Sequence, residues 1–144
     1  MECKNCKKEL ETLPDWGMLN INEFCSNKCS REYNNKFYFI SFFKAIQNQV
    51  HEIAIQKGWW DKDVEVGTKI ALIHSELSEG LEALRKNKQS DKISGFLGIE
   101  EELADVIIRI MDDADRNNWR VAEALIAKME YNENREYRHG NKEF

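Results

Sequence analysis

The sequence is poor in proline and in long apolar runs, and both shortages limit the folds open to it. Its single proline, Pro14, lies near the start, so no missing backbone N–H interrupts a helix after residue 36. The most apolar stretch, Phe37–Phe43, is much shorter than the roughly 20 residues that a membrane-spanning helix needs. No segment resembles a signal peptide. We therefore expect a cytoplasmic protein with no membrane partner.

Basic charge is not in excess, which argues against a dedicated nucleic-acid binder. The formal net charge is -5. Residues 1–36 carry equal numbers of basic and acidic side chains, so the acidic excess lies after residue 36. Neither part has the basic stripe that recognises a phosphate backbone. With 42% hydrophobic and 33% charged residues, the chain has the composition of a soluble globular protein.

The four cysteines divide the chain into two regions. All of them lie in residues 1–35, together with the proline and several turn-forming residues. Residues 36–144 contain no cysteine and have the patterns of successive helices. The length of 144 residues suits one ordinary domain with a small appendage. We expect a four-cysteine module over 1–35 and a helical domain over 36–144.

Apolar residues recur at steps of three and four in the second region, as in amphipathic helices. The helices are expected over residues 36–57, 63–87, 97–117 and from Asn118 to about 137. The core-facing stripe of the second helix is expected to contain Ile70, Ile73, Leu77, Leu81 and Leu84. Four such helices on mostly short connections predict an all-α fold: an antiparallel four-helix bundle preceded by the small module.

Turn-forming and capping residues mark the expected helix ends. Gly58 is expected to end the first helix because glycine adopts the left-handed conformation that follows a helix. Asp61 or Asp63 is expected to cap the second helix, and Asn118 the fourth, since short polar side chains accept the first free N–H groups.

Two acidic motifs are the sharpest chemical signal. The second helix carries Glu76-x-x-Glu79 and the third carries Glu102-x-x-Asp105. Residues three apart share a helix face, so each motif presents two carboxylates beside the apolar stripe. If these faces meet, four carboxylates converge, and a divalent cation would relieve their repulsion. Oxygen ligands favour Mg²⁺ or Mn²⁺. A solvated acidic face is the alternative.

These motifs resemble a known family. Residues 73–85 (IHSELSEGLEALR) and 101–109 (EELADVIIR) are similar to the MazG-like branch of the all-α nucleoside triphosphate pyrophosphohydrolases, whose signature is ExxE, a spacer and ExxD. The segment Lys57-Gly58-Trp59-Trp60 also resembles the family. So do Lys128, Asn132, Arg135 and His139-Gly140. The resemblance covers about residues 45–142 and leaves the cysteines outside.

The resemblance implies hydrolysis between the α- and β-phosphates of a nucleotide, giving a monophosphate and pyrophosphate. It implies Mg²⁺ bound by Glu76, Glu79, Glu102 and Asp105, with these four residues as the catalytic site. It also implies a homodimer or homotetramer in which a second subunit helps to complete each site.

Further residues are candidates for catalysis and substrate binding. Glu79 is the tentative general base because it lies furthest from the apolar stripe of its helix. Cations near the end of the chain suit phosphate oxygens, and Trp59 and Trp60 would stack on a base or anchor the core. The end-of-chain candidates are Lys128, Asn132, Arg135, His139 and Lys142. Arg109 is expected to pair with Asp112 or Glu102, with phosphate binding as the alternative.

The cysteine spacing predicts a structural zinc site. Cys3-x2-Cys6 and Cys25-x3-Cys29 are two pairs of the kind that coordinate Zn²⁺ tetrahedrally. The second pair resembles the FCS type of zinc finger, in which it opens a helix. We expect that helix to continue into the first helix of the bundle. The module would be too small to fold without the metal. Contact with nucleic acid or protein is open, and balanced charge argues against strong nonspecific nucleic-acid binding.

Two functions of different classes therefore follow from the sequence. The first is a Mg²⁺-dependent nucleotide pyrophosphohydrolase that controls or cleans a nucleotide pool. The alternative is a non-catalytic, zinc-containing helical scaffold on which the acidic motifs are a solvated face.

Overall fold

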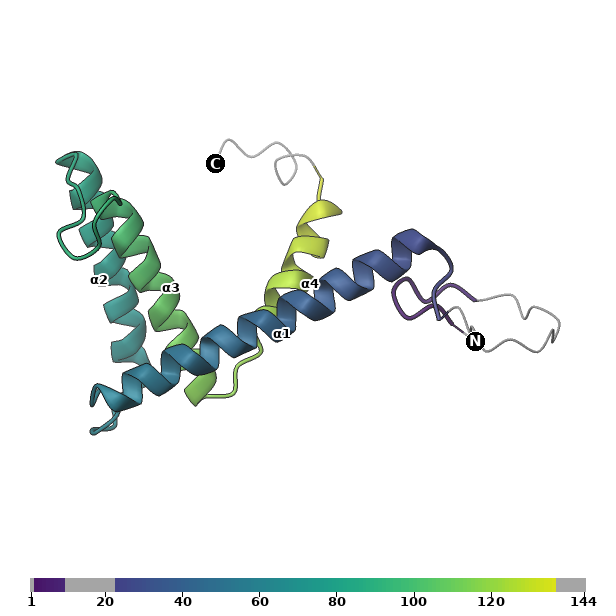
Figure 1. Cartoon of the computed structure of the whole chain (residues 1–144), viewed down its shortest axis with the longest axis horizontal. Helices are drawn as coiled ribbons and strands as arrows, with labels where there is room; N and C mark the ends of the chain where they lie inside the picture. Colours follow the sequence, from purple (N-terminus) through teal and green to yellow (C-terminus); the bar gives the residue numbers. More distant parts are fainter. Residues whose placement is uncertain (1, 10–22, 137–144) are drawn as a thin grey trace. The chain divides into compact units, whose positions relative to one another are not determined.

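The computed structural model describes residues 2–9 and 23–136, and this part of the chain is helical. Its helices are α1 (Asn27–Gln56), α2 (Val66–Arg85), α3 (Gly98–Arg116) and α4 (Val121–Glu133), as Figure 1 shows. Besides them, these residues form only isolated β-bridges. The expected all-α fold is confirmed. None of the described helices has both the length and the apolar character that crossing a bilayer requires.

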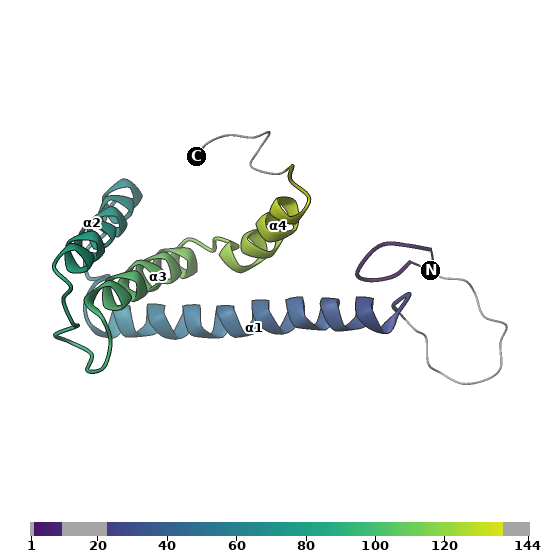
Figure 2. The ribbon, with the colours of Figure 1, turned by 90° about the horizontal axis from the view of Figure 1, so that it is seen from above.

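Helix α1 is continuous across the junction between the two regions of the sequence. It has 30 residues with no proline or glycine and runs without interruption in Figure 2. The helix that opens at the second cysteine pair and the one expected from residue 36 are thus a single helix. The chain divides into two compact units, Met1–Phe43 with Leu125–Phe144 and Lys44–Ala124, and α1 belongs to both.

Three helices end on a residue in the left-handed conformation. These residues are Gly58 (φ 79°), Asn87 (φ 48°) and Asn118 (φ 54°). Beyond Gly58, the N–H of Trp59 donates to the carbonyl of Ala54 at 3.1 Å, and α2 and α3 close in the same way. This is the Schellman motif, and it satisfies carbonyls that the helix leaves free. Gly58 ends α1 as expected.

The expected capping residues were wrong. Asn118 does not cap α4, which begins at Val121; it ends α3, because a short polar side chain tolerates the left-handed conformation. Neither Asp61 nor Asp63 caps α2, whose N-cap is Glu65, with no side-chain hydrogen bond to the helix.

The end of α1 gives a first testable prediction. Gly58→Ala should lower the free energy of unfolding by about 1 kcal/mol, because an L-residue is strained at this φ. The added Cβ would also lie 2.9 Å from Asp61 Oδ2. Gly67→Ala is the matched control, since it lies in α2 with no atom within 4 Å of an added Cβ. Thermal melting should show a lower midpoint only for Gly58→Ala, and equal midpoints would contradict this account.

Helices α2 and α3 pack as an antiparallel hairpin through small residues. A Cβ on Gly80 would lie 3.4 Å from Glu102 Cβ, and a Cβ on Gly98 would lie 3.0 Å from Ala83 Cβ. Farther along, Lys69 pairs with Asp113, so the start of α2 meets the end of α3. Helices α2 and α3 lie side by side in Figure 1. Close approach at Gly80 and Gly98 brings the acidic motifs of the two helices together.

The apolar stripe of α2 does not form this contact. The α2 residues buried against α3 are Glu76, Gly80 and Ala83. Four of the five stripe residues are instead exposed by 42–62% of their surface: Ile70, Leu77, Leu81 and Leu84. The expectation that these four face the core of the chain was wrong, because the small-residue face packs more closely. A leucine-rich surface is left exposed on the hairpin.

Candidate functional site

Three of the four predicted carboxylates form one cluster. Oxygen atoms of Glu76, Glu102 and Asp105 all lie within 4.8 Å of one another. Glu76 is buried on α2, and Glu102 and Asp105 are half-buried on α3. The i,i+3 spacing on α3 places both of its acids on the face that meets α2. Three of the four motif carboxylates therefore meet across the hairpin.

The fourth predicted carboxylate, Glu79, lies outside this cluster. Its side chain is exposed, and it lines a separate cavity of about 320 Å³ with Glu82, Glu101 and Glu102. Three residues along a helix correspond to about 60° of rotation round the axis, which places Glu79 beside the contact with α3 rather than in it. The prediction that all four acids converge was thus wrong for Glu79, because periodicity does not fix which side of α2 meets α3.

The negative charge of the cluster is not fully compensated by neighbouring groups. Burial raises the pKa of Glu102, and the neighbouring Glu76 carboxyl raises it further, while Lys92 acts in the opposite direction. Within the described residues, Glu102 Oε2 is buried without a hydrogen-bond partner. An orphaned carboxylate oxygen among three acids fits a divalent cation with hard oxygen ligands, such as Mg²⁺.

A buried acid next to the motif anchors the loop before α3. Glu101 accepts a hydrogen bond from the Ser90 hydroxyl at 2.5 Å and forms an ion pair with Lys92 at 2.6 Å. Lys92 and Ser90 lower the pKa of Glu101. The loop is therefore held against the start of α3, which carries Glu102. We did not predict this role from the sequence, although the adjacent acids Glu101-Glu102 were a signal for it.

Arg109 pairs with the cluster through Glu76. Its Nε lies 2.8 Å and its Nη2 2.5 Å from Glu76 Oε1. The expected pairing with Asp112 or Glu102 was wrong, because close packing of the hairpin brings Arg109 to α2. The guanidinium compensates one of the three carboxylate charges.

A cavity of about 390 Å³ adjoins the cluster. Asp105 and Arg109 lie in its wall, which is otherwise largely apolar and includes Trp59. Trp59 is 67% exposed. The other residues that line the cavity are Val50, Ile53, Ala54, Lys57, Val64, Lys69, Leu72, Ile108, Asp112 and Asp113. A pocket with an apolar wall and an acidic, metal-fitting edge is suited to a ligand with a phosphate end and an aromatic end.

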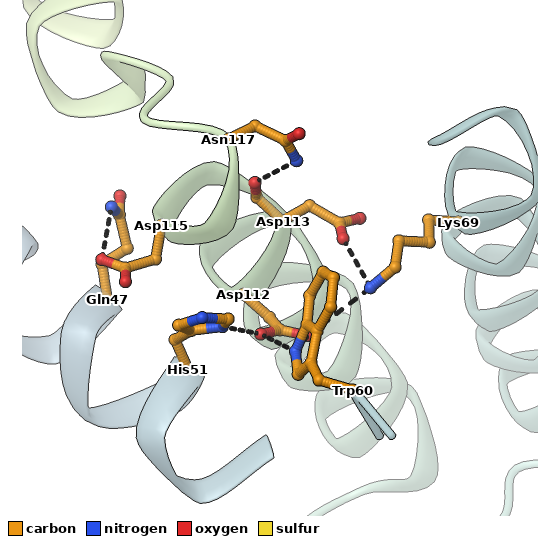
Figure 3. Close-up of polar contacts among 8 residues, drawn as sticks. All are labelled: Gln47, His51, Trp60, Lys69, Asp112, Asp113, Asp115 and Asn117. Atoms are coloured by element: carbon orange, nitrogen blue, oxygen red, sulfur yellow. Dashed lines mark hydrogen bonds and ion pairs between the residues drawn. The ribbon is translucent and has the colours of Figure 1, made fainter. Parts of the chain in front are cut away.

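Trp60 takes part in a polar network that the sequence did not reveal. Asp112 accepts a hydrogen bond from the indole N–H of Trp60 at 2.9 Å, and its Oδ1 lies 2.6 Å from His51 Nδ1 (Figure 3). Lys69 lies 3.2 Å from the centre of the Trp60 ring and 3.0 Å from Asp113. Trp60 is thus fixed in place by these contacts, in keeping with an anchor residue.

The network joins α3 to its neighbours. Gln47 of α1 donates to Asp115 at 3.2 Å, and the Asn117 side chain donates to the Asp113 carbonyl at 2.7 Å (Figure 3). Asp112 lies seven positions after Asp105, about two helical turns along the same face. That spacing was the available signal, and it places the network on the side of α3 that lines the cavity.

The four cysteines form a second cluster in the other unit. Their Sγ atoms lie within 4.8 Å of one another, and Cys25 Sγ is 3.4 Å from both Cys6 and Cys29. Cys3 is fully buried. Tetrahedral coordination with Zn–S bonds of about 2.3 Å separates sulfur atoms by roughly 3.8 Å, so this arrangement fits a metal ion such as zinc.

The backbone around Cys3 supports that arrangement. Cys3 N–H donates to the Lys8 carbonyl at 2.9 Å and Lys7 N–H to the Cys3 carbonyl at 3.0 Å, with Lys7 left-handed at φ 62°. Burial opposes ionisation of Cys3, but N–H groups led by that of Cys6 lower the pKa of its thiol to about 6. Contacts with Cys29 and then Cys6 raise the pKa of Cys25 to about 12. A metal ion would remove this conflict by favouring thiolates.

The predicted residues near the end of the chain lie in the same unit as the cysteines. Lys128 and Arg135 lie 4.5 and 5.4 Å from the centre of the Tyr131 ring, and Arg135 Nη1 donates to Asn132 at 3.1 Å. His139 and Lys142 lie outside the described residues. Lys128 and Arg135 thus both lie near the Tyr131 ring, and Asn132 contacts Arg135.

Comparison with known proteins identifies no relative. No family model, curated protein or solved structure matches the chain.

Proposed function

We propose that this chain is a Mg²⁺-dependent nucleoside triphosphate pyrophosphohydrolase of the MazG-like type, which produces a nucleoside monophosphate and pyrophosphate. The observation that carries the proposal is the cluster of Glu76, Glu102 and Asp105, with its orphaned Glu102 oxygen, at the edge of a cavity. Such a donor set suits an ion that also binds substrate phosphates.

The carboxylates have separate tasks in this proposal. Glu76, Glu102 and Asp105 would hold the cation, which when bound neutralises phosphate charge and activates a water for attack on phosphorus. Glu79 is exposed beside the cluster and outside it, so its carboxylate is available to accept the proton of the attacking water. It remains our candidate for the base.

The cavity would hold the nucleoside. Trp59 lies in its wall and is exposed, so it offers a face for stacking on a base. Trp60 would serve the pocket indirectly, by ordering Lys69 and Asp112. By resemblance alone, we propose phosphate contacts for Lys128, Asn132, Arg135, His139 and Lys142.

The exposed leucine surface supports a second copy of the chain as partner. Ile70, Leu77, Leu81 and Leu84 would become buried if two α2–α3 hairpins joined in an antiparallel bundle. A homodimer or homotetramer is therefore part of the proposal. Light scattering should give a multiple of the 17.0 kDa chain mass, and a mass of one chain would contradict it.

We propose Zn²⁺ for the cysteine cluster, in a structural role. Four thiolates would fill the coordination shell and leave no position for substrate. The module would then stabilise the start of α1, which contains Cys29.

A nucleotide panel tests the enzymatic function against the scaffold alternative. The purified chain should release pyrophosphate from at least one canonical, modified or alarmone nucleotide when Mg²⁺ is present, and the other product should be the monophosphate. Activity should disappear with EDTA and return with Mg²⁺. Absence of metal-dependent hydrolysis across the panel would favour a zinc-containing helical scaffold.

A further inference from the structure

Arg109 is shared by the carboxylate cluster and the cavity. Two of its nitrogens contact the same oxygen, Glu76 Oε1, and the residue lines the cavity wall together with Asp105. Its side chain is 32% exposed, so the guanidinium is held in place but not enclosed. A residue in this position would contact both the ion site and whatever fills the cavity.

The contact with Glu76 leaves donors on the guanidinium. Arginine carries five N–H groups, and the two contacts use one on Nε and one on Nη2. Nη1 makes no hydrogen bond to other described residues, and a second N–H remains on Nη2. The planar fork matches a phosphate group, which accepts paired hydrogen bonds.

The same contact affects the charge of the cluster. Arg109 offsets the charge of Glu76 and leaves Glu102 and Asp105 to repel each other. A fixed positive charge beside the cluster reduces its attraction for a divalent cation. Arg109 should therefore stabilise the ion-free cluster and weaken cation binding, while strengthening the binding of an anion.

We propose that Arg109 is a phosphate-binding residue that Glu76 orients, placed so that the substrate phosphates lie between its guanidinium and the cation held by the cluster. The apolar part of the cavity then receives the rest of the ligand, which makes the ligand an organic phosphate with an aromatic group. This inference rests on the proposed function.

The proposal predicts effects of opposite sign for one substitution. In Arg109→Gln, the affinity for Mn²⁺ without nucleotide should rise about threefold or more, because the competing charge is gone. The affinity for a non-hydrolysable α,β-imido nucleoside triphosphate, measured with saturating Mn²⁺, should fall about tenfold or more, because charged hydrogen bonds are lost. The analogue is that of a nucleotide which the panel identifies as a substrate. If none is identified, the adenosine triphosphate analogue is used. Calorimetry measures both affinities.

Two further variants serve as controls. Arg120→Gln removes the same charge from an exposed position just beyond the end of the same helix, and it should leave both affinities unchanged. Arg109→Lys keeps the charge without the fork, so Mn²⁺ affinity should return to the wild-type value while analogue affinity returns only in part.

A purely structural role would give a different result. If Arg109→Gln lowers both affinities together with the melting temperature, or changes neither, the phosphate-binding role is overturned. If the wild-type chain binds no Mn²⁺ at the cluster, the proposed function fails instead. Mn²⁺ binding with an unaltered analogue affinity in Arg109→Gln would overturn only the present inference.

Discussion

Asp105→Asn should abolish Mg²⁺-dependent pyrophosphate release, lowering kcat/KM by about 10²–10³-fold or more. Asp105 supplies a carboxylate to the cluster and also lines the cavity, so its charge acts where cation and substrate meet. Asparagine keeps the size of the side chain but lacks the charge. Melting temperature should change little, because the substitution relieves repulsion among like charges.

Substitutions of the other acids should distinguish the metal ligands from the general base. Glu76→Gln and Glu102→Gln should lose both Mn²⁺ binding and hydrolysis. Glu79→Gln should keep Mn²⁺ binding and lose mainly kcat, because Glu79 lies outside the cluster. Asp63→Asn is the control, since Asp63 is an exposed acid in the loop before α2. Wild-type hydrolysis by Asp105→Asn would refute the assignment of the cluster as the catalytic centre.

Cys3→Ser should release the metal from the cysteine cluster and unfold the module around it. Cys3 is fully buried, so the serine hydroxyl would remain in the core without the thiolate bond. Structural zinc contributes on the order of 10 kcal/mol to the folding of small zinc modules, far more than so few residues can replace. Elemental analysis should find about one zinc per wild-type chain and clearly less in the variant.

The consequences of zinc loss should be confined to folding. A zinc chelator should lower the melting temperature of the wild-type chain, and Zn²⁺ but not Mg²⁺ should restore it. Hydrolysis by the folded fraction should persist, since the carboxylates lie in the unit Lys44–Ala124. If the wild-type chain contained no zinc as purified, and Cys3→Ser left its melting temperature unchanged, the zinc assignment would be eliminated.

The sequence predicted the helices and the membership of the cysteine cluster well. Steps of three and four, without proline, predicted helices within a few residues of α2 (Val66–Arg85) and α3 (Gly98–Arg116). Such patterns depend on local chemistry alone. The cysteine spacing likewise placed all four sulfur atoms in one cluster.

The interior of the hairpin was less predictable, because it depends on which helix face packs most closely. Gly80 and Gly98 allow close approach, so α2 buries its small-residue face and exposes Leu81 and its neighbours. Because α2 turns this face toward α3, Glu79 lies outside the cluster and Arg109 reaches Glu76. Periodicity identifies the candidate faces, but it cannot rank them without the contacts between helices.

A crystal of the chain soaked in Mn²⁺ tests the central claim most directly, because manganese scatters anomalously and its position can be read without assumption. We expect an anomalous peak about 2.0–2.3 Å from oxygens of Glu76, Glu102 and Asp105. A soaked crystal in which these three side chains bind no ion, while Mn²⁺ occupies another site, would contradict the account.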